Sequence, residues 1–524
     1  MAASTAARAP LDSKAAEKPS GPEYFRAKPK RRPAYALEPV EPRLLMSADL
    51  SYSTAASGQA FYLVATGARS FALDLNSAGG AQVATFTQAG SDNSVSIDLS
   101  TSLGLSNSNT LHVDLDTFNL LNSSFFSPNG GLVISFEEGK AIAGGSTSNP
   151  DHLSVDAATN PNIGFGISIT SDSDITTSGH ASITGDFSLT SSQKASDALT
   201  SGLFVFNNAG VTLSGANYQV SGAFKATAHD DVTASTNGLG MSAISGALIS
   251  NNSTSTIAIT NNSVVNAGSI ELDSKIDGTM TAAADQATVQ LVVIQGAADP
   301  EVAIDGSSQL IAATVTATAE SNVTISATTT PGGGGSASAD AAISNVTYSS
   351  GATLTVTGGA LVNATSGAAN LNANSTLDAT TKGDASGASA GAGVAVSTIY
   401  GDTIAKVDNA TVDGGSVTIG ASTDRTITVE AKSSQGGSSG SSGDASGESN
   451  YTSQKTLSDN NASTSDGSIS VAGAVAVSVD TGATTAYVNN GTINAGAGAA
   501  SVTAASADNA SVTADGSSTT SGAT

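Results

Sequence analysis

The residues of this chain that could do chemistry are mainly acidic, and the clearest of them stand in three close pairs. The pairs are Asp114 with Asp116, Asp172 with Asp174, and Asp230 with Asp231. Two carboxylates two positions apart lie on one face of a strand, where their oxygens could hold a hard cation such as Ca²⁺. The sequence has no Gly-Gly-x-Gly-x-Asp nonapeptide and no EF-hand loop. It therefore favours acids solvated in turns and on strand faces over a calcium site.

The same carboxylates could serve as a general acid and base, as in β-helix enzymes that cleave polysaccharides. Such a site needs two carboxyl groups in one cleft, and basic residues usually hold the anionic sugar. Lys225 with His229, Asp230 and Asp231 is the only local cluster of this composition. Because residues 46–524 carry only ten scattered Lys and Arg, we expect the protein not to be an enzyme. A polysaccharide lyase or hydrolase remains an alternative.

Other patterns of catalysis and metal binding are missing from the sequence. There is no Cys, and the four histidines stand too far apart for zinc spacing: His112, His152, His180 and His229. No Gly-x-Ser-x-Gly elbow occurs in a strand-to-helix context, and the Gly-rich run Pro331–Gly335 lacks the Lys-Ser/Thr of a phosphate loop. We expect no catalytic residue, no cofactor-binding residue and no metal ligand, and no cofactor.

Charge is distributed unevenly along the 524 residues. The whole chain has a net charge of −25, but residues 1–45 contain nine Lys and Arg against five acids. The remaining residues have a balance of −29, so they should repel nucleic acid. The sequence therefore indicates no nucleic-acid partner.

The elements that would position these residues form a degenerate internal repeat in the second half of the chain. The segments are Ser242–Ala283, Ala287–Thr329, Asp340–Thr380, Ala392–Ala431 and Gly473–Ala514. One aligned apolar position recurs in all five, at Ile259, Ile304, Val356, Val407 and Val488, with spacings of 45, 52, 51 and 81 residues. Such self-similarity is typical of stacked units that bury their apolar edges against their neighbours.

The short alternating strands, punctuated by Asn, Asp and Gly, predict an all-β fold. Only Ser191–Leu203 has helical periodicity over more than two turns. Aromatic residues make up only 4% of the chain, which does not suit the bulky core of a β-sandwich. The sequence also lacks the regular signature of β-propeller blades. We predict a right-handed parallel β-helix, with about two coils of roughly 23 residues per repeat and a rod roughly 75 Å long at the spacing of parallel strands.

Three regions follow from these patterns. Residues 1–50 should be a disordered basic tail, and residues 51–155, rich in aromatics, a non-repetitive β segment that could cap the repeats. Residues 156–524 should be the β-solenoid, interrupted by a Ser/Gly-rich insert at residues 433–466. No stretch has the roughly 18 apolar residues of a transmembrane helix, and the N-terminus lacks the apolar core of a secretory signal. The last residues lack a cap pattern, so we expect the sequence to be part of a longer protein.

Residues Leu37–Leu50 resemble the LEPR-XLL motif of very large bacterial surface or secreted proteins. The match is Glu41-Pro42-Arg43, then Leu44 and Leu45, then Ser47-Ala48-Asp49. It departs from the motif in a second Glu-Pro and in Met46. The resemblance implies membership among giant exported repeat proteins, often with calcium-binding or adhesive repeats.

Small-residue runs such as Ala390–Val396 and Val471–Val477 open the repeats. They resemble the repeats of filamentous-haemagglutinin-like and autotransporter-type β-helix adhesins. The sequence thus predicts an adhesin or structural stalk, extracellular or on the bacterial cell surface in association with the outer membrane, that presents polar β-faces to glycans or partner proteins. The first alternative is a calcium-binding repeat region of a type-I-secreted giant protein.

Overall fold

The computed structural model describes residues 60–87, 94–98, 110–121, 131–137, 152–200, 202–238, 244–285, 287–330, 340–386, 391–433 and 472–516. All of them belong to the unit Met46–Thr524. Within these ranges the chain is all-β, as predicted, with its strands joined in one large mixed sheet and one short 3-10 helix, η1 (Leu115–Leu120). The predicted basic tail, the LEPR-XLL-like motif and nearly all of the predicted Ser/Gly-rich insert lie outside the described residues.

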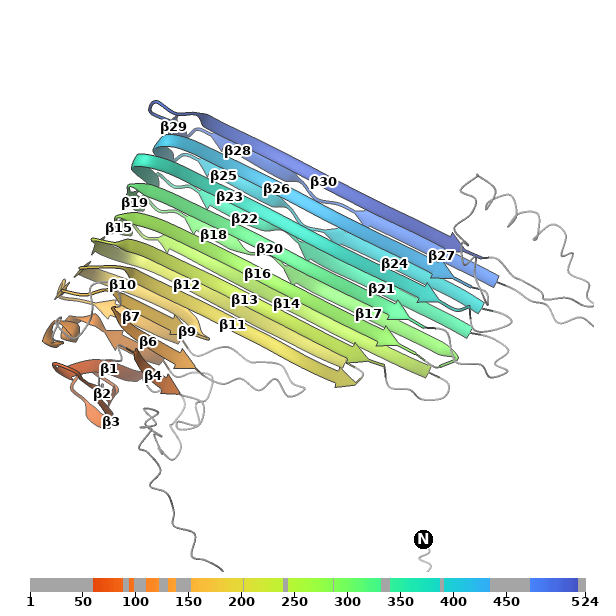
Figure 1. The fold of residues 1–524 in the computed structure, drawn as a ribbon, viewed down its shortest axis with the longest axis horizontal. Helices are drawn as coiled ribbons and strands as arrows, with labels where there is room; N and C mark the ends of the chain where they lie inside the picture. The colour runs from red at the N-terminus through yellow and green to blue at the C-terminus, as the bar shows by residue number, and fades with distance from the viewer. Residues whose placement is uncertain are drawn as a thin grey trace, which may run out of the picture. The chain divides into compact units, whose positions relative to one another are not determined.

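The first strands differ from the rest in their direction. β1 (Ala60–Gly67), β2 (Ser70–Leu75) and β3 (Ala81–Thr87) pair antiparallel. β1 then pairs in parallel with β5 (Thr110–Asp114), and β5 pairs in parallel with β7 (His152–Ala157). The antiparallel strands therefore lead into a parallel stack (Figure 1).

The later strands stack in three walls, in which each strand pairs in parallel with the strand one layer away. Wall 1 continues from β7 through β10 (Asp174–Ile183), β12 (Gly202–Val220) and β14 (Ile244–Thr260), and then through pairs of shorter strands. These pairs are β17 (Val289–Ala298) with β18 (Glu301–Ile304), β21 (Asp340–Ser350) with β22 (Ala352–Val356), β24 (Gly391–Tyr400) with β25 (Thr403–Asp408), and β27 (Ala472–Asp480) with β28 (Thr484–Asn489).

Wall 2 is short and wall 3 is long. Wall 2 contains β8 (Asn162–Ile163), the ends of β10 and β12, β15 (Val264–Asn266), β19 (Gln309–Ala312), the starts of two wall 3 strands and β29 (Thr492–Asn494). Wall 3 contains β4 (Ser94–Asp98), β6 (Leu132–Glu137), β9 (Ile167–Ser171), β11 (Phe187–Thr200), β13 (Ala223–Asn237), β16 (Ser269–Ala284), β20 (Thr314–Thr329), β23 (Leu361–Asp384), β26 (Thr411–Lys432) and β30 (Ala500–Asp515).

The five aligned residues of the repeat pair with one another in successive layers of wall 1. Ile259 pairs with Ile304, and the register continues through Val356 and Val407 to Val488. Each repeat of 45 to 52 residues thus forms one layer, not two. The expectation of roughly 23 residues per coil, and the rod length based on it, was wrong because single strands of wall 3 are up to 24 residues long.

Alternation along the strands places apolar side chains inside the walls. β16 alternates between inward buried and outward exposed or half-buried side chains over its whole length, as period-2 strand geometry requires. The segment with helical periodicity, Ser191–Leu203, lies largely in β11 and is extended. The helical reading was wrong because parallel pairing with β13, registered from Phe187 to Thr200, overrides local propensity.

Tight turns join walls 1 and 2, and they need left-handed backbone. Asn261, Asn409 and Asn490 have φ values of 55°, 50° and 48° at the same point in their layers. Gly358, with a φ of 65°, occupies this point in another layer. Asn and Gly tolerate this conformation better than other residues, which explains why the aligned position of the repeat is followed by them.

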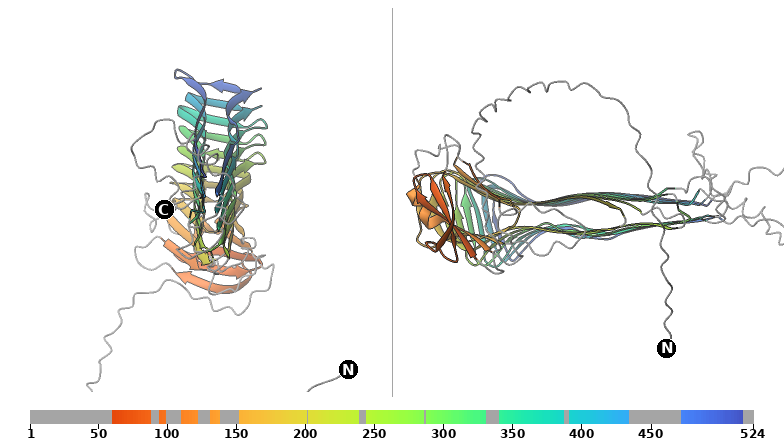
Figure 2. Two further views of the ribbon diagram at one scale, coloured as in Figure 1. Left: turned by 90° about the vertical axis from the view of Figure 1, so that its right-hand side faces the viewer. Right: turned by 90° about the horizontal axis from the view of Figure 1, so that it is seen from below.

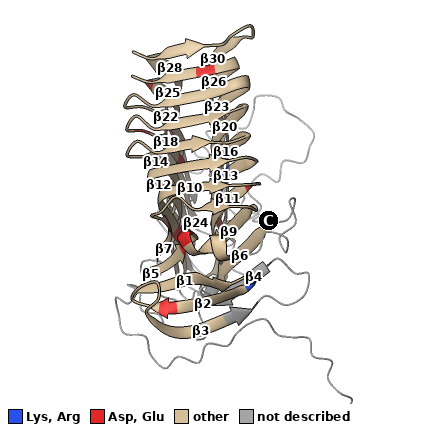
Figure 3. Ribbon diagram, turned by 90° about the vertical axis from the view of Figure 1, so that its left-hand side faces the viewer, with Lys and Arg blue, Asp and Glu red and all other residues tan. Residues whose placement is uncertain are grey.

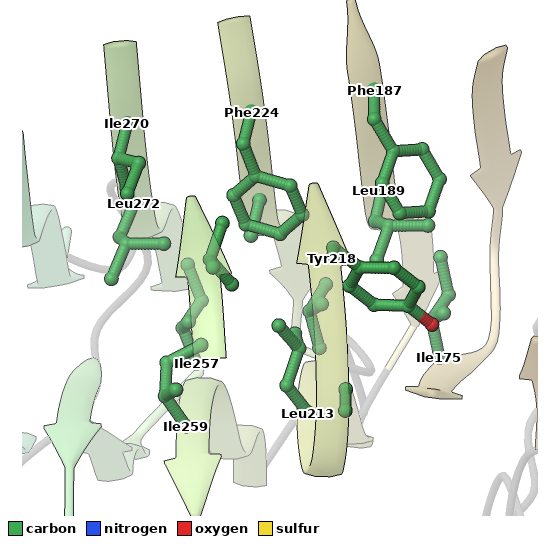
Figure 4. Close-up of a cluster of buried hydrophobic side chains, with 14 of the residues drawn as sticks. Ile175, Phe187, Leu189, Leu213, Tyr218, Phe224, Ile257, Ile259, Ile270 and Leu272 are labelled. Atoms are coloured by element: carbon green, nitrogen blue, oxygen red, sulfur yellow. The ribbon is translucent and has the colours of Figure 1, made fainter. Parts of the chain in front are cut away.

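The walls enclose two apolar cores of different width (Figure 2, right). In the wide part all three walls surround the first core, which holds large side chains such as Phe187, Tyr218 and Phe224 (Figure 4). Phe187 contacts the other two rings edge-on, at centroid distances of 5.1 and 5.7 Å. In the narrow part walls 1 and 3 face each other directly around the second core, whose side chains are mostly Ala, Val and Ile.

Buried hydroxyl groups lie along the boundary of the two cores, and we call this line the polar seam. Its cross-wall bonds join Ser255 to Ser274 at 3.0 Å, Ser321 to Ser350 at 3.2 Å, Ser350 to Ser375 at 3.1 Å and Thr403 to Thr423 at 2.9 Å. Each hydroxyl finds a partner across the interior, as a buried polar group must. Short Ser and Thr side chains let walls 1 and 3 approach here, and the seam therefore fixes where the wide part ends.

Candidate functional site

Asp114 and Asp116 have structural roles at η1. Asp114 Oδ1 accepts a hydrogen bond of 3.0 Å from the backbone N–H of Asp116 and caps the helix. Asp116 accepts bonds of 2.8 and 2.9 Å from the N–H groups of Ala158 and Thr159, just beyond β7. Burial raises the pKa of Asp114. The two acids do not share a strand face as predicted, because β5 ends at Asp114 and Asp116 lies in η1.

Asp172 and Asp174 lie where the chain enters β10. Asp174 is the first residue of β10, and its Oδ2 accepts a bond of 2.8 Å from Asn208 in the next layer of wall 1. Asn208 Oδ1 in turn accepts a bond of 2.7 Å from Thr254. Asp172 precedes the strand, and its N–H donates to the carbonyl of Phe136 at 3.4 Å. Asp174, Asn208 and Thr254 thus form a chain of hydrogen bonds that links successive layers on the outer side of wall 1.

Asp230 and Asp231 point in opposite directions. They are neighbours on β13, so one faces the interior and the other faces solvent. Asp231 lies 3.1 Å from Lys194 Nζ of β11. Asp230 is fully buried and its Oδ1 accepts a bond of 2.7 Å from Asn207 Nδ2. The two carboxylates therefore cannot serve one cation or one sugar together.

The surroundings of Asp230 form a closed polar cluster between the walls. Burial raises the pKa of Asp230 to about 7. On the same side of the interior, Asn251 Nδ2 donates to Tyr348 Oη at 2.8 Å, and Asn251 Oδ1 accepts a bond of 3.0 Å from the Ser253 hydroxyl. All of these side chains are buried. A perturbed carboxylate often marks an active site, but burial of the whole cluster keeps substrates out and gives it a structural role.

The cluster around Lys225 and His229 is a ladder of ion pairs on the outer surface of wall 3. Lys225 Nζ lies 2.8 Å from Glu271 in the next layer, and His229 Nε2 lies 2.9 Å from Asp277. Lys275 lies 3.2 Å from Asp277 as well. The pKa of Asp277 is lowered overall. Burial acts to raise it, but the hydrogen bonds that the carboxylate accepts from Asn322, Lys275 and His229 have the larger combined effect. Each of these bases is paired with an acid, and the pairs of Lys225 and His229 link adjacent layers.

His112 is paired with a single acid. His112 Nδ1 lies 2.6 Å from Asp156 Oδ2 and its ring stacks on Tyr62 at 4.4 Å. In the described part of the chain, no three His, Asp or Glu side chains come together as a metal site would require. Among the same residues, no helix has the length and apolar character needed to cross a membrane.

The outer surface of wall 3 in the narrow part is rich in hydroxyl groups, and we call it the polar face. Two columns of outward residues run across β13, β16, β20, β23, β26 and β30. The first contains Thr233, Thr279, Thr324, Asp378, Thr426 and Asn509, and the second contains Ser235, Thr281, Ser326, Thr380, Thr428 and Ser511. Residues of one column are about 4.8 Å apart and the columns about 6.7 Å apart, by strand geometry.

The outer surface of wall 1 in the narrow part is apolar, and we call it the apolar face. Its exposed large side chains lie on β12, β14, β17, β21, β24 and β27, and they include Ile244, Val289, Leu291, Ile343, Val475 and Val477. Sequence reasoning missed this face and described the runs that form it only as small-residue segments that open the repeats. The available signal was that both alternating sets of residues in these runs are apolar, which is typical of strands covered on both sides.

Asp, Glu, Lys and Arg are sparse on the side of the stack that Figure 3 shows. Comparison with known proteins adds no assignment: no family model, no curated protein and no solved structure matches this chain.

Proposed function

We propose that this chain is an exported or cell-surface repeat protein that acts as an adhesin or structural stalk, built as a parallel β-helix. The parallel register supports the fold proposal, because each layer of walls 1, 2 and 3 pairs with the next over five repeats. Right-handedness remains part of the proposal. The acidic pairs favour a binding role over catalysis, because Asp230 and Asp231 point in opposite directions and Asp116 accepts bonds from backbone N–H groups.

The observation that carries the binding role is the polar face. Its Thr, Ser and Asn side chains stand in register on six parallel strands, so their hydroxyl and amide groups form a regular array. Several of them, including Thr279 and Thr324, are exposed. A rigid array of donors and acceptors can hydrogen-bond the hydroxyls of a glycan or the backbone of a partner protein at little cost in ordering its own groups.

A binding screen with a matched pair of variants tests this role. The full chain would be screened against a glycan array and bacterial or host surface proteins, and the tightest ligand would be kept. Thr279→Val with Thr281→Val removes two adjacent hydroxyls of the polar face and keeps side-chain shape and strand propensity. At about 1 kcal/mol per hydrogen bond, binding should weaken roughly 10- to 30-fold.

The control replaces Thr353 and Thr355, which face outward on β22 of wall 1, with Val. It should leave the affinity unchanged. Equal binding by both variants, or no ligand in either screen, would contradict the proposal. Repeating the assay with a calcium chelator distinguishes a calcium-independent adhesin from the calcium-binding alternative. The calcium-binding alternative requires that chelation abolish binding or β structure.

A further inference from the structure

The apolar face is too exposed for a surface that meets only water. Ile244 is 59% exposed, Leu291 44% and Ile343 37%. They belong to a continuous patch, since Leu291 pairs with Ile343 and the register continues to Val394 and Val475. Single exposed apolar residues are ordinary, but a contiguous patch marks an interaction site.

The strands beneath this face have the composition of a sheet covered on both sides. Residues 291–294 read Leu-Val-Val-Ile and residues 473–477 read Gly-Ala-Val-Ala-Val. Parallel strands buried on both faces show such continuous apolar runs, whereas strands with one solvated face alternate. The inner side of these strands is occupied by the second core. The outer side therefore has the character of a surface that is also covered.

Charge identifies what can cover it. The wall 1 segments of the narrow part, residues 202–208, 244–252, 289–297, 341–349, 392–400 and 473–479, contain no Asp, Glu, Lys or Arg. The chain as a whole has a net charge of −25. Two copies of so acidic a protein repel each other wherever charged surfaces meet, and this face lets them approach without opposing charges.

The size of the face also fits a second copy. Six strands about 4.8 Å apart and about four outward positions about 6.7 Å apart give an area on the order of 600 Å². Two such faces would bury about 1,200 Å², the lower limit of a stable specific interface. Homodimer interfaces are the more apolar class, and two sheets pack face to face at about 10 Å through side chains of this size.

We propose that two copies of this chain form a dimer by packing their apolar faces against each other across a two-fold axis. The partner is a second copy because the same uncharged surface then serves both sides, as an isologous interface requires. The polar faces of both copies would remain outside and point in opposite directions. The inference goes beyond the proposed binding role and stands independently of it.

A lipid surface is the competing occupant, and the chemistry of the face opposes it. Proteins that lie on membranes usually combine apolar residues with Lys and Arg that attract anionic headgroups. The apolar face has no basic residue in its strands, and the described chain around it is acidic. Vesicle binding is therefore an outcome that would overturn the proposal.

Sedimentation velocity of the full chain tests the dimer, with two chains of 51.0 kDa as the expected species. Measurements up to about 100 µM would populate a dimer with a micromolar dissociation constant. Leu291→Glu places a charge at the centre of the face, and it should raise the dissociation constant at least about 100-fold because an unpaired carboxylate would be buried. Val475→Glu should have the same effect from another strand.

Thr324→Glu is the matched control, because it adds the same charge to an exposed outward position on the polar face. It should leave the dimer intact, and circular dichroism would verify that all variants keep their β structure. A monomer across the whole concentration range would overturn the proposal, as would a dimer that survives both Leu291→Glu and Val475→Glu. Flotation of the monomer with neutral or anionic phospholipid vesicles, lost in Leu291→Glu, would assign the face to lipid instead.

Discussion

The wide and narrow parts of the stack are built from the same strands but stabilised differently. In the wide part, three walls enclose rings and long aliphatic side chains such as Phe224 and Ile257 (Figure 4). In the narrow part, two walls enclose small side chains such as Ala282 and Ala327, and buried polar residues such as Asp230 and Arg425 interrupt them. The interior of the narrow part thus offers less apolar area per residue.

This difference explains why the apolar face lies on the narrow part. Buried apolar area supplies the main stabilising free energy of a fold, at about 25 cal/mol per Å². Where two walls enclose a core of mostly Ala, Val and Ile, a second apolar layer outside wall 1 would add buried apolar area to that of the interior. The wide part has a third wall in place of that outer layer. Three pairs of substitutions would test this contrast.

The largest expected effect is on a matched pair within one strand. Ile249 and Ile257 are both fully buried on β14, the first in the narrow part and the second in the wide part. We expect Ile257→Ala to lower the free energy of unfolding by about 4 kcal/mol and Ile249→Ala by about 2 kcal/mol, because two facing walls can collapse onto a cavity more easily than three. Urea unfolding of both variants measures the difference. Equal losses of unfolding free energy would contradict the proposed distinction between the wide and narrow parts.

The second effect concerns the buried guanidinium of Arg425, which joins walls 1 and 3 in the narrow part. It donates to Asp480 Oδ1 and to the carbonyl of Gly401, both at 2.7 Å, and to the carbonyl of Ser350 at 3.1 Å. Arg425→Leu leaves these acceptors without their donor, and should cost about 3 kcal/mol. Lys225→Leu, which breaks the exposed pair with Glu271, should cost at most about 1 kcal/mol when both variants are unfolded in urea.

The smallest effect depends on pH and arises at Asp230. Its pKa is raised by burial to about 7 in the folded state, against about 3.9 when unfolded. The unfolded chain therefore releases its proton first, and stability falls as pH rises from about 4 to about 7. Asp230→Asn should change little at pH 4 and stabilise by about 2 kcal/mol at pH 8.

Asp231→Asn is the control for that substitution, because Asp231 is the outward neighbour and its partner Lys194 is well exposed. It should change stability by at most about 0.5 kcal/mol at either pH. Chemical denaturation at several pH values measures both variants. A wild-type stability that stays constant between pH 4 and pH 8 would contradict the burial argument.

Particular residues show how far sequence reasoning reached. The aligned position at Ile259, Ile304 and Val356 was found from the shared pattern of the repeats, and these residues do pair in adjacent strands. The number of coils per repeat was not predictable, because strand length in a solvent-facing Thr/Ser tract has no sharp sequence boundary. Ser191–Leu203 shows the same limit, since its helical pattern yields to pairing with a neighbour in the stack.

The candidate sites failed for a related reason. Spacing correctly suggests which neighbours share a strand face only when the strand continues through both residues, and β5 ends between Asp114 and Asp116. The polar seam was not foreseen because its bonds join serines 19 to 29 residues apart in different walls.

By itself, the sequence determined that this chain is all-β and that its repeats stack in register. It also determined that Asn or Gly closes the turn after each aligned residue. These features depend on local alternation and on backbone preference. Only the tertiary structure decided which side of each strand is covered. The side chain of Asp230 is buried, whereas that of Asp231 faces outward and is half-buried. Leu291 likewise faces outward beside the buried Val292. The side that is covered depends on which wall lies opposite.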